Sequence, residues 1–354
     1  MSLHRHLQPW ASRFRGPEAI FGGEPLLAGP RIILENGERV PLHGLGYVDS
    51  DTGAITEWKV PEGDIISYVW DNEKSHFEAI HKATRGCTPR APRGSPNVFL
   101  DVGANHGLFG FMAAARGCIV EFYDPQVKCA DLLSKTTATL PYRDRIKVVG
   151  RPVGDPLTLS VAYSEICAGR YEAAPGQNDV AWNKSQGSQW GQTYTPYEGY
   201  TSTPQGSREV TSLSLDEIIA GRRIACLKVD VESFEASVLR SGARSFAAAL
   251  VDVLIVEVST QTWTEKGWNM AEQAEPFLAL IRAGYRAKIL RGREALGDPG
   301  DCFAFQGAAL SETNPELLRA DLTRDVGQRD YMFVAKHVLE AAAAARAAAG
   351  EPPF

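Results

Sequence analysis

The sequence lacks any apolar run that approaches the roughly 20 residues needed to cross a bilayer. It also lacks a basic surplus, because the formal net charge is −6, and this argues against general binding of nucleic acid. The N-terminus has no apolar core of the kind found in secretory signals. Arg5, Arg13 and Arg15 precede the first acid, Glu18, which leaves organelle targeting as an alternative. We expect no stable membrane insertion and no nucleic-acid partner.

Metal-ligand spacing is absent as well. The six cysteines form no Cys-x-x-Cys pair and no cluster of histidines accompanies them, so we expect no metal site. Cys118 and Cys226 stand inside apolar runs and are interpreted as small buried hydrophobic residues. This usage of cysteine favours a reducing compartment, and we predict a cytoplasmic protein.

The N-terminal part contains short β-like runs separated by turn signals, at residues 31–34, 55–60 and 65–70. A helical pattern over 72–84 and a linker rich in Pro, Gly and Arg over 87–96 follow. We therefore divide the chain into a β-rich N-terminal extension, a main domain and an alanine-rich tail that forms a frayed helix, over residues 1–95, 96–337 and 338–354.

From residue 97 onward, apolar runs that suit strands alternate with helical patterns. The expected strands lie at 97–102, 118–124, 145–149, 223–230, 251–258, 284–290 and 330–335. The expected helices lie at 107–116, 126–138, 233–240, 269–282 and 312–322. Such alternation is typical of an α/β fold with a doubly wound, largely parallel sheet and helices on both faces. Residues 164–208 interrupt it with many aromatic and polar side chains but few aliphatic ones, which favours an inserted lid or recognition loop over a disordered insert.

The first chemical feature is a glycine-bearing turn between a strand and a helix. The apolar run from Asn97 ends in Asp101, and Gly103, Asn105 and Gly107 follow before the next helical pattern. Glycine lets the backbone approach a ligand closely, and Asn105 can adopt a left-handed conformation or hydrogen-bond the turn itself. Backbone N–H groups of such a turn suit an anionic or polar ligand group.

The pattern is incomplete for a dinucleotide, which requires Gly-x-Gly-x-x-Gly to hold its pyrophosphate. S-adenosylmethionine has no pyrophosphate. Asp101 is placed to bind its ammonium group, and the turn amides suit its carboxylate. The alternative is that Asp101 only caps the turn and Gly107 only permits close packing of helix and strand. Asp124 falls 23 residues after Asp101, at the distance expected for a ribose-binding acid. Asp155 follows the third strand and is predicted either to contact the adenine amine or to serve an ordinary turn.

A second cluster lies in the segment from Cys226 to Glu235. Strand alternation puts Lys228, Asp230 and Glu232 on one face, with apolar residues opposite. Ligands of doubly wound sheets bind beyond the carboxyl ends of the strands, where these acids and Glu257 of the next strand are expected. A purely structural salt bridge between Lys228 and one carboxylate is the alternative.

At this point the chain resembles the FkbM family of S-adenosylmethionine-dependent methyltransferases. The resemblance rests on Phe99 to Gly107, on Val210 to Ile219, on Leu227 to Glu235, on Ile255 to Val258 and on Tyr331 to Val334. It implies a seven-stranded class I methyltransferase sheet whose last strand is antiparallel. It also implies O-methylation of a sugar or natural-product hydroxyl. Ser233 stands where the family usually has glycine, and Asp124 stands where it commonly has glutamate.

We therefore predict a methyltransferase that uses S-adenosylmethionine on a small-molecule hydroxyl acceptor. Asp230 or Glu232 is the expected general base, Glu257 and Lys228 are supporting polar groups, and His106 is a further candidate base. The competing hypotheses are a non-catalytic binding module on the same fold and a dinucleotide-dependent oxidoreductase. Neither the acceptor nor the oligomeric state follows from the sequence.

Overall fold

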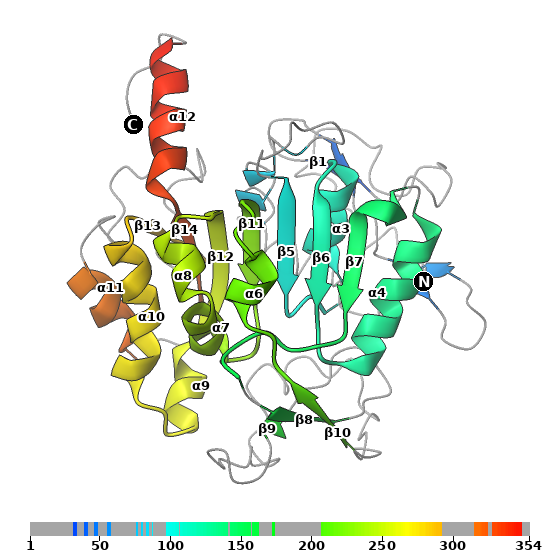
Figure 1. The fold of residues 1–354 in the computed structure, drawn as a ribbon, viewed down its shortest axis with the longest axis horizontal. Coiled ribbons are helices and arrows are strands. Elements are labelled where there is room, and N and C mark those ends of the chain that lie inside the picture. The colour runs from blue at the N-terminus through cyan, green and yellow to red at the C-terminus, as the bar shows by residue number, and fades with distance from the viewer. Residues whose placement is uncertain are drawn as a thin grey trace, which may run out of the picture.

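The computed structural model describes residues 97–105, 107–140, 142–156, 158–162, 172–173, 207–291, 315–324 and 328–348. It also describes short segments and single positions between residues 31 and 87. A sheet of seven strands with helices on both of its faces forms the centre of this part of the chain (Figure 1). The predicted α/β doubly wound fold is therefore confirmed.

The seven strands follow the order β13–β14–β12–β11–β5–β6–β7 across the sheet. Their bounds are Val98–Val102 for β5, Ile119–Tyr123 for β6, Ile146–Val149 for β7, Ile224–Val229 for β11, Val251–Ser259 for β12, Arg286–Arg291 for β13 and Gln328–Val334 for β14. Neighbouring strands from β7 to β12 run parallel, whereas β14 runs antiparallel to both β12 and β13. The order reverses between β5 and β11, and that is where doubly wound sheets bind their ligands.

One face of the sheet packs against α3 (Leu108–Ala115), α4 (Val127–Thr139) and the segment that precedes the sheet. His76, Ala79, Ile80 and Ala83 are helical, in agreement with the helix expected over 72–84. Ala79 and Ile80 are fully buried in the same core as Phe99 of β5 and the side chains of β11, β12 and β14 that share its face. The segment before the predicted boundary at residue 96 thus covers part of the sheet, and the boundary itself stays a prediction.

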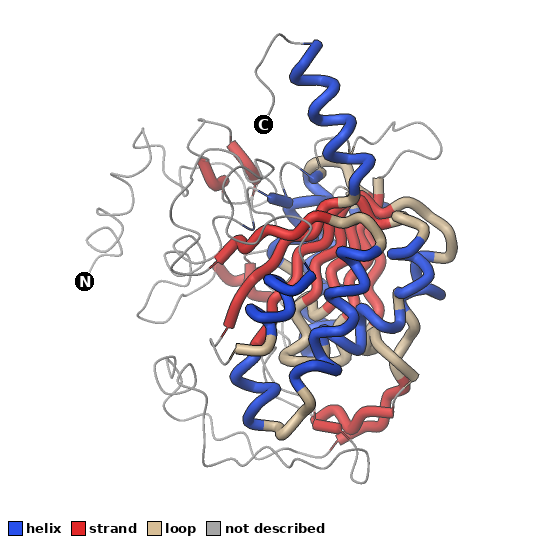
Figure 2. The backbone as a smooth tube through the Cα atoms, turned by 90° about the vertical axis from the view of Figure 1, so that its left-hand side faces the viewer, coloured by secondary structure: helices blue, strands red, loops and turns tan. Residues whose placement is uncertain are grey.

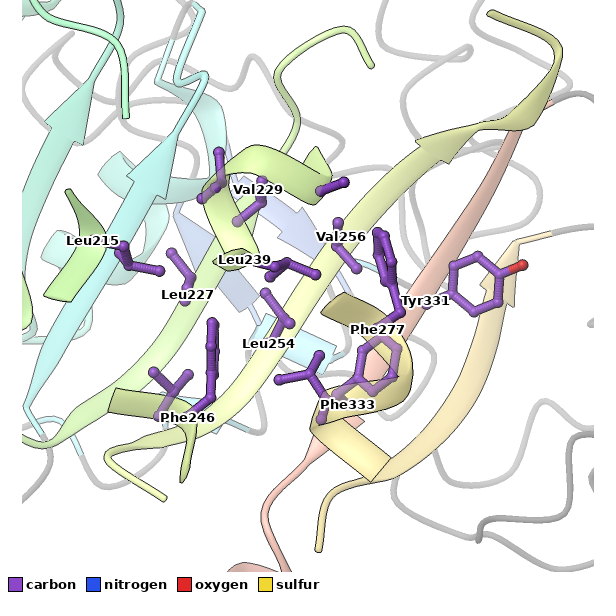
Figure 3. Packing of buried hydrophobic residues seen from close by; sticks show 14 of the residues in the cluster. Leu215, Leu227, Val229, Leu239, Phe246, Leu254, Val256, Phe277, Tyr331 and Phe333 are labelled. Atoms are coloured by element: carbon purple, nitrogen blue, oxygen red, sulfur yellow. The ribbon is translucent and has the colours of Figure 1, made fainter. Parts of the chain in front are cut away.

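The other face packs against a layer of mostly short helices. They are α6 (Leu215–Ile219), α7 (Glu235–Ser241), α8 (Ala243–Ala247), α9 (Thr260–Glu265), α10 (Met270–Arg282) and α11 (Pro315–Leu322). Figure 3 shows this core, in which Leu239 of α7, Phe246 of α8 and Phe277 of α10 lie against alternate residues of the strands. Because α6, α8 and α9 are five or six residues long, they carry too few turns to show a helical period in the sequence.

A small antiparallel sheet of β8 (Thr158–Ala162), β9 (Glu172–Ala173) and β10 (Ser207–Thr211) is inserted between β7 and α6. Figures 1 and 2 place it beyond the carboxyl ends of the parallel strands, apart from the main sheet. Except for β9, the insert predicted over 164–208 lies outside the described residues until β10 begins. On the opposite side, α12 (Lys336–Ala348) forms the helix expected for the alanine-rich tail and projects away from the sheet (Figure 2).

Near the N-terminus, two antiparallel pairs of short strands form, which agrees with the expected β-rich extension. The pairs are β1 (Arg31–Ile33) with β2 (Arg39–Pro41) and β3 (Gly46–Val48) with β4 (Ile55–Glu57). The β-like run over 65–70 lies outside the described residues. In the part of the chain that the structure describes, no helix combines the length and apolarity needed to cross a membrane.

The cysteines require a correction. Cys118 is buried, as expected, but it forms a disulfide with Cys87 and is not simply a small hydrophobic residue. Cys129 of α4 is also disulfide-bonded, whereas Cys226 is a buried free thiol. Pairing of Cys87 with Cys118 depends on packing the N-terminal segment beside β6, which no local sequence pattern reveals. Cysteine usage therefore no longer argues for a reducing compartment, and the cytoplasmic location stays a prediction.

Candidate active site

The turn after β5 has the left-handed backbone expected from its residue types. Gly103, Asn105 and Gly107 have φ angles of 77°, 49° and 78°. A Cβ atom on Gly103 would overlap the backbone carbonyl of Asp230, and one on Gly107 would crowd Leu133 of α4. Packing against backbone therefore requires glycine at position 103, whereas at Gly107 the positive φ angle favours glycine and the neighbouring atoms are side chains. Contact of Gly103, Asn105 and Gly107 with a cofactor stays a prediction.

Asp101 is the most deeply buried acid at this turn, with a relative exposure of 1%. Its Oδ2 accepts a hydrogen bond from the backbone N–H of Gly110 at 3.1 Å, in α3. Its Oδ1 has no hydrogen-bond partner among the described residues. Burial raises the pKa of Asp101 to about 7, although the nearby Lys228 ammonium lowers it. A buried carboxylate with one unused oxygen is a site that a cationic group can stabilise.

Asp124 follows β6 and holds the glycine turn in place. Its Oδ2 accepts from the N–H of Asn105 at 2.8 Å, and its Oδ1 accepts from the N–H of Gln126 at 2.8 Å. Burial raises the pKa of Asp124 to about 6, because it outweighs these two hydrogen bonds. Each carboxylate oxygen can accept a second hydrogen bond, so the predicted ribose contact is compatible with this geometry.

Asp155 is tied to the opposite layer of helices. Its carboxylate pairs with Arg240 of α7 at 2.8 Å, and its backbone binds the hydroxyls of Ser212 and Ser237. These contacts provide the ordinary turn role that the sequence left open. The alternative contact with an adenine amine stays a prediction.

Lys228 and Asp230 share one face at the end of β11, as alternation predicted. Lys228 Nζ lies 3.0 Å from Asp230 Oδ2, so the salt bridge considered as an alternative is present. Lys228 also pairs in register with Asp101 of β5, and its Nζ lies 5.4 Å from the centre of the Phe109 ring. Burial opposes the charge of Lys228, but the carboxylates of Asp230 and Asp101 outweigh burial and raise its pKa. The ammonium group is therefore a fixed positive charge between two acids.

Glu232 does not continue the alternation, because β11 ends at Val229. Its side chain is exposed and its φ angle is 53°, in the turn that leads to α7. Ser233 has a φ angle of 86° and so adopts the conformation for which the FkbM pattern has glycine. Trp263 Nε1 donates to the Ser233 carbonyl at 3.2 Å, and Lys266 Nζ donates to its hydroxyl at 3.1 Å. These contacts hold a strained serine in place. The catalytic role of Glu232 stays a prediction.

Glu235 supports the same turn from below. Its Oε1 accepts from the backbone N–H groups of Val231 at 3.2 Å and Ser233 at 2.9 Å. The residue is almost completely buried, and burial raises its pKa to about 8. Glu235 is therefore a buried acid that holds the turn between β11 and α7 in place.

Glu257 lies near the carboxyl end of β12, where it pairs in register with Asp330 of β14. Sequence reasoning missed Asp330, although the antiparallel direction expected for the last strand would have brought its first residues to this edge. Asp330 is fully buried, and its Oδ1 lies 3.5 Å from Nε2 of the buried His76. The His76 ring centre lies 6.0 Å from that of Phe109.

The structure thus brings five charged residues together on one face of the sheet, at the carboxyl ends of its parallel strands. They lie on or directly after the neighbouring strands β5, β11, β12 and β14 and are Asp101, Lys228, Asp230, Glu257 and Asp330. His106 lies outside the described residues. Within the described part of the chain, no group of three or more His, Cys, Asp or Glu side chains is arranged to hold a metal ion.

Comparison with solved structures finds methyltransferases at low similarity. A geranyl diphosphate methyltransferase in complex with SAM has 13% identity and a TM-score of 0.37, over 83% of this chain and 96% of that chain. Geranyl diphosphate C-methyltransferase from Streptomyces coelicolor A3(2), with Mg2+, geranyl diphosphate and S-adenosyl-L-homocysteine, has 12% identity and a TM-score of 0.34, over 82% and 87%. The StiE O-MT has 11% identity and a TM-score of 0.33, over 77% and 76%.

Comparison with curated proteins finds no match. The family model described as the methyltransferase FkbM domain matches residues 101–287, just over half of the chain. The match begins at Asp101 and includes the glycine turn, β11 with Lys228 and Asp230, and β12 with Glu257. The chain belongs to the FkbM methyltransferase family.

Proposed function

We propose that this protein transfers a methyl group from S-adenosylmethionine to a hydroxyl group of a small-molecule acceptor, such as a sugar or another natural product. Family membership supports methyl transfer, and the geometry of the edge described above supports the choice of cofactor. O-methylation is supported by the family resemblance and by the polar groups on β11, β12 and β14.

The observation that carries this proposal is the state of Asp101. S-adenosylmethionine supplies a methyl group activated by a positively charged sulfur, together with an ammonium group that needs an anionic partner. Asp101 offers a buried carboxylate oxygen without a hydrogen-bond partner among the described residues. An unused buried acceptor is costly, and an ammonium group would offset that cost by donating to it.

The position of Asp101 supports the same cofactor. It is the last but one residue of β5, directly beside the point where the strand order reverses, and ligands of doubly wound sheets bind at such a point. Asp124 ends the adjacent strand and retains capacity to accept from a ribose diol. The residues present therefore fit the methionine and ribose groups of S-adenosylmethionine.

The acceptor is expected on the other side of the reversal point, above β11 and β12. Asp230 and Glu257 lie there, and Lys228 fixes the orientation of the Asp230 carboxylate at 3.0 Å. These side chains can orient an acceptor hydroxyl toward the methyl carbon, which is the main requirement for in-line transfer. The protein must also keep water away from this point.

Calorimetric titration of the full chain with S-adenosylmethionine, S-adenosylhomocysteine and NAD tests the cofactor. We expect both adenosyl compounds to bind and NAD not to bind. Binding of NAD alone would favour the oxidoreductase, and binding of none would favour a non-catalytic module.

Transfer is then measured with S-adenosylmethionine carrying a labelled methyl group, against a panel of sugars, polyols, polyketides and fractionated small molecules. We expect label in a hydroxyl-bearing acceptor and a large loss of transfer in Asp230→Asn. The matched control is Asp216→Asn, which removes an acid that binds Ser245 in the helix layer on the opposite face. Transfer at the wild-type rate in Asp230→Asn would remove Asp230 from the mechanism.

A further inference from the structure

A histidine from outside the family match reaches the edge where the acceptor is expected. His76 belongs to the helical segment that covers the sheet face shared by α3 and α4. Its Nε2 lies 3.5 Å from Oδ1 of Asp330, whose strand β14 follows β12 in the sheet. Both side chains are nearly or completely buried, with exposures of 3% and 0%.

Phe109 connects His76 to the residues already described. Its ring centre lies 6.0 Å from the centre of the His76 ring and 5.4 Å from Lys228 Nζ. Phe109 is the second residue of α3 and follows the glycine turn directly. His76 and Lys228 therefore both lie beside the same aromatic ring.

The charged groups near His76 come from each of the strands beneath it. Asp330 of β14 is its direct neighbour, and Glu257 of β12 pairs in register with Asp330. Lys228 of β11 lies beside the Phe109 ring, and Asp230 pairs with Lys228. Asp101 of β5 pairs in register with Lys228 on the next strand.

We propose that His76 is the general base of the transfer reaction and that Asp330 is its positioning residue. This inference rests on the proposed function and adds a proton acceptor to it. The acceptor oxygen forms a bond to the methyl carbon, and the bond from carbon to sulfur breaks with its electron pair remaining on sulfur. The hydroxyl proton passes to the unprotonated ring nitrogen of His76. Asp330 stabilises the resulting imidazolium, which later releases the proton to water.

One contact of Asp230 and one general property of histidine favour His76 over Asp230 as the base. Asp230 Oδ2 already accepts a hydrogen bond from the Lys228 ammonium at 3.0 Å, so that oxygen is occupied by a donor. Histidine is the side chain whose ordinary pKa lies closest to neutral pH, and a carboxylate next to it is a common orienting partner in catalysis.

The chain contains a matched control for this inference. His337 forms a second histidine–aspartate pair, with its Nε2 2.9 Å from Asp252 Oδ1. Asp252 is the second residue of β12, so this pair lies at the opposite edge of the sheet from Glu257. A histidine that serves only to pair with an acid should behave like His337.

The first test uses nitrogen-15 NMR of the histidines in the full chain, with His76 assigned from the spectrum of His76→Asn. The probes are S-adenosylmethionine, which carries the sulfonium charge, and S-adenosylhomocysteine, which does not. We expect the His76 titration midpoint to lie about 0.5 to 1 pH unit lower with S-adenosylmethionine than with S-adenosylhomocysteine, because the sulfonium repels the imidazolium. The His337 midpoint should be the same with both. Equal His76 midpoints would overturn the proposal, and this readout requires no acceptor.

The second test measures transfer to the acceptor found by the panel. We expect His76→Gln to lose at least about 100-fold in kcat while its Kd for S-adenosylmethionine and its Tm stay close to wild type. Asp330→Asn should shift both the His76 midpoint and the acid limb of the kcat–pH profile to lower pH, and His337→Gln should change neither kcat nor this profile. Wild-type kcat in His76→Gln would refute the role of His76 and leave the proposed cofactor intact. Failure of the wild-type chain to bind S-adenosylmethionine would instead refute the proposed function together with this inference.

Discussion

Replacing Asp101 with asparagine should stabilise the fold while it abolishes cofactor binding. Asp101 is 1% exposed, and burial raises its pKa from 3.8 to about 7, a value that already includes the attraction of Lys228. The difference of about three pKa units corresponds to about 4 kcal/mol, at about 1.4 kcal/mol per unit. Asparagine is uncharged, and its side-chain oxygen can still accept the hydrogen bond from the N–H of Gly110.

The expected gain in the free energy of unfolding follows from comparing the ionisation of Asp101 in the folded and unfolded chains. Above pH 7 the Asp101 carboxyl is ionised in both states, and the folded state bears the full cost of burying the charge. Well below pH 3.8 the group is protonated in both states and the cost disappears. The free energy of unfolding of Asp101→Asn should therefore exceed that of the wild type by up to about 4 kcal/mol at pH 8.5, and by less than about 1 kcal/mol at pH 4.

Urea unfolding at pH 4, 5.5 and 8.5 measures this difference, provided that both proteins show the same m-value. The control is Asp216→Asn. Burial raises the pKa of Asp216, but hydrogen bonds from Ser245 and Arg244 outweigh burial and lower it. That variant should lose stability at pH 8.5, and its difference from wild type should close as the pH falls. A loss of stability in Asp101→Asn at pH 8.5, or a difference that does not change with pH, would refute the reasoning.

Three further predictions concern the turn, its acid and the disulfide. Affinity for S-adenosylmethionine should fall as the pH drops below 7, because its ammonium group needs the ionised form of Asp101. Calorimetry in two buffers with different ionisation enthalpies should detect the proton that Asp101 releases on binding. A constant affinity from pH 5.5 to 8 would exclude this contact. Gly103→Ala should lower the free energy of unfolding by several kcal/mol more than Gly267→Ala, which should lower it by about 1 kcal/mol. Both positions have positive φ angles, but only Gly103 faces a backbone carbonyl. Equal unfolding midpoints of the two variants would contradict this prediction. Cys87→Ser should lower the free energy of unfolding by about 3 to 4 kcal/mol, since its bridge to Cys118 closes a loop with a sequence separation of 31. A reductant should lower the Tm of the wild type by more than that of the variant, which keeps the disulfide of Cys129.

Much of the fold could be predicted because its signals are local. The parallel strands are buried on both faces and therefore appear as continuous apolar runs, as in Val251 to Ser259. The alternation of Lys228 and Asp230 with apolar neighbours placed both on one face. A left-handed backbone was one of two possibilities that the residue type indicated for Asn105, and its φ angle is positive.

The candidate site could be predicted only in part, because its members meet through contacts between distant segments. Asp101 and Asp230 stand at the predicted edge, whereas Asp155 binds Arg240 of the opposite layer and Glu232 lies in a turn beyond its strand. The reason why Gly103 must be glycine became evident only when the carbonyl of Asp230 was found beside it.

The sequence by itself determined the strands, the longer helices and the acids that end β5 and β11, since periods of two and 3.6 residues and turn preferences act between near neighbours along the chain. Only the tertiary structure decided that His76 meets Asp330 and that Cys87 meets Cys118. Those pairings depend on the direction of β14 and on the packing of a helical segment over the sheet. Such packing is a property of surfaces assembled from distant parts of the chain, and no local pattern specifies it.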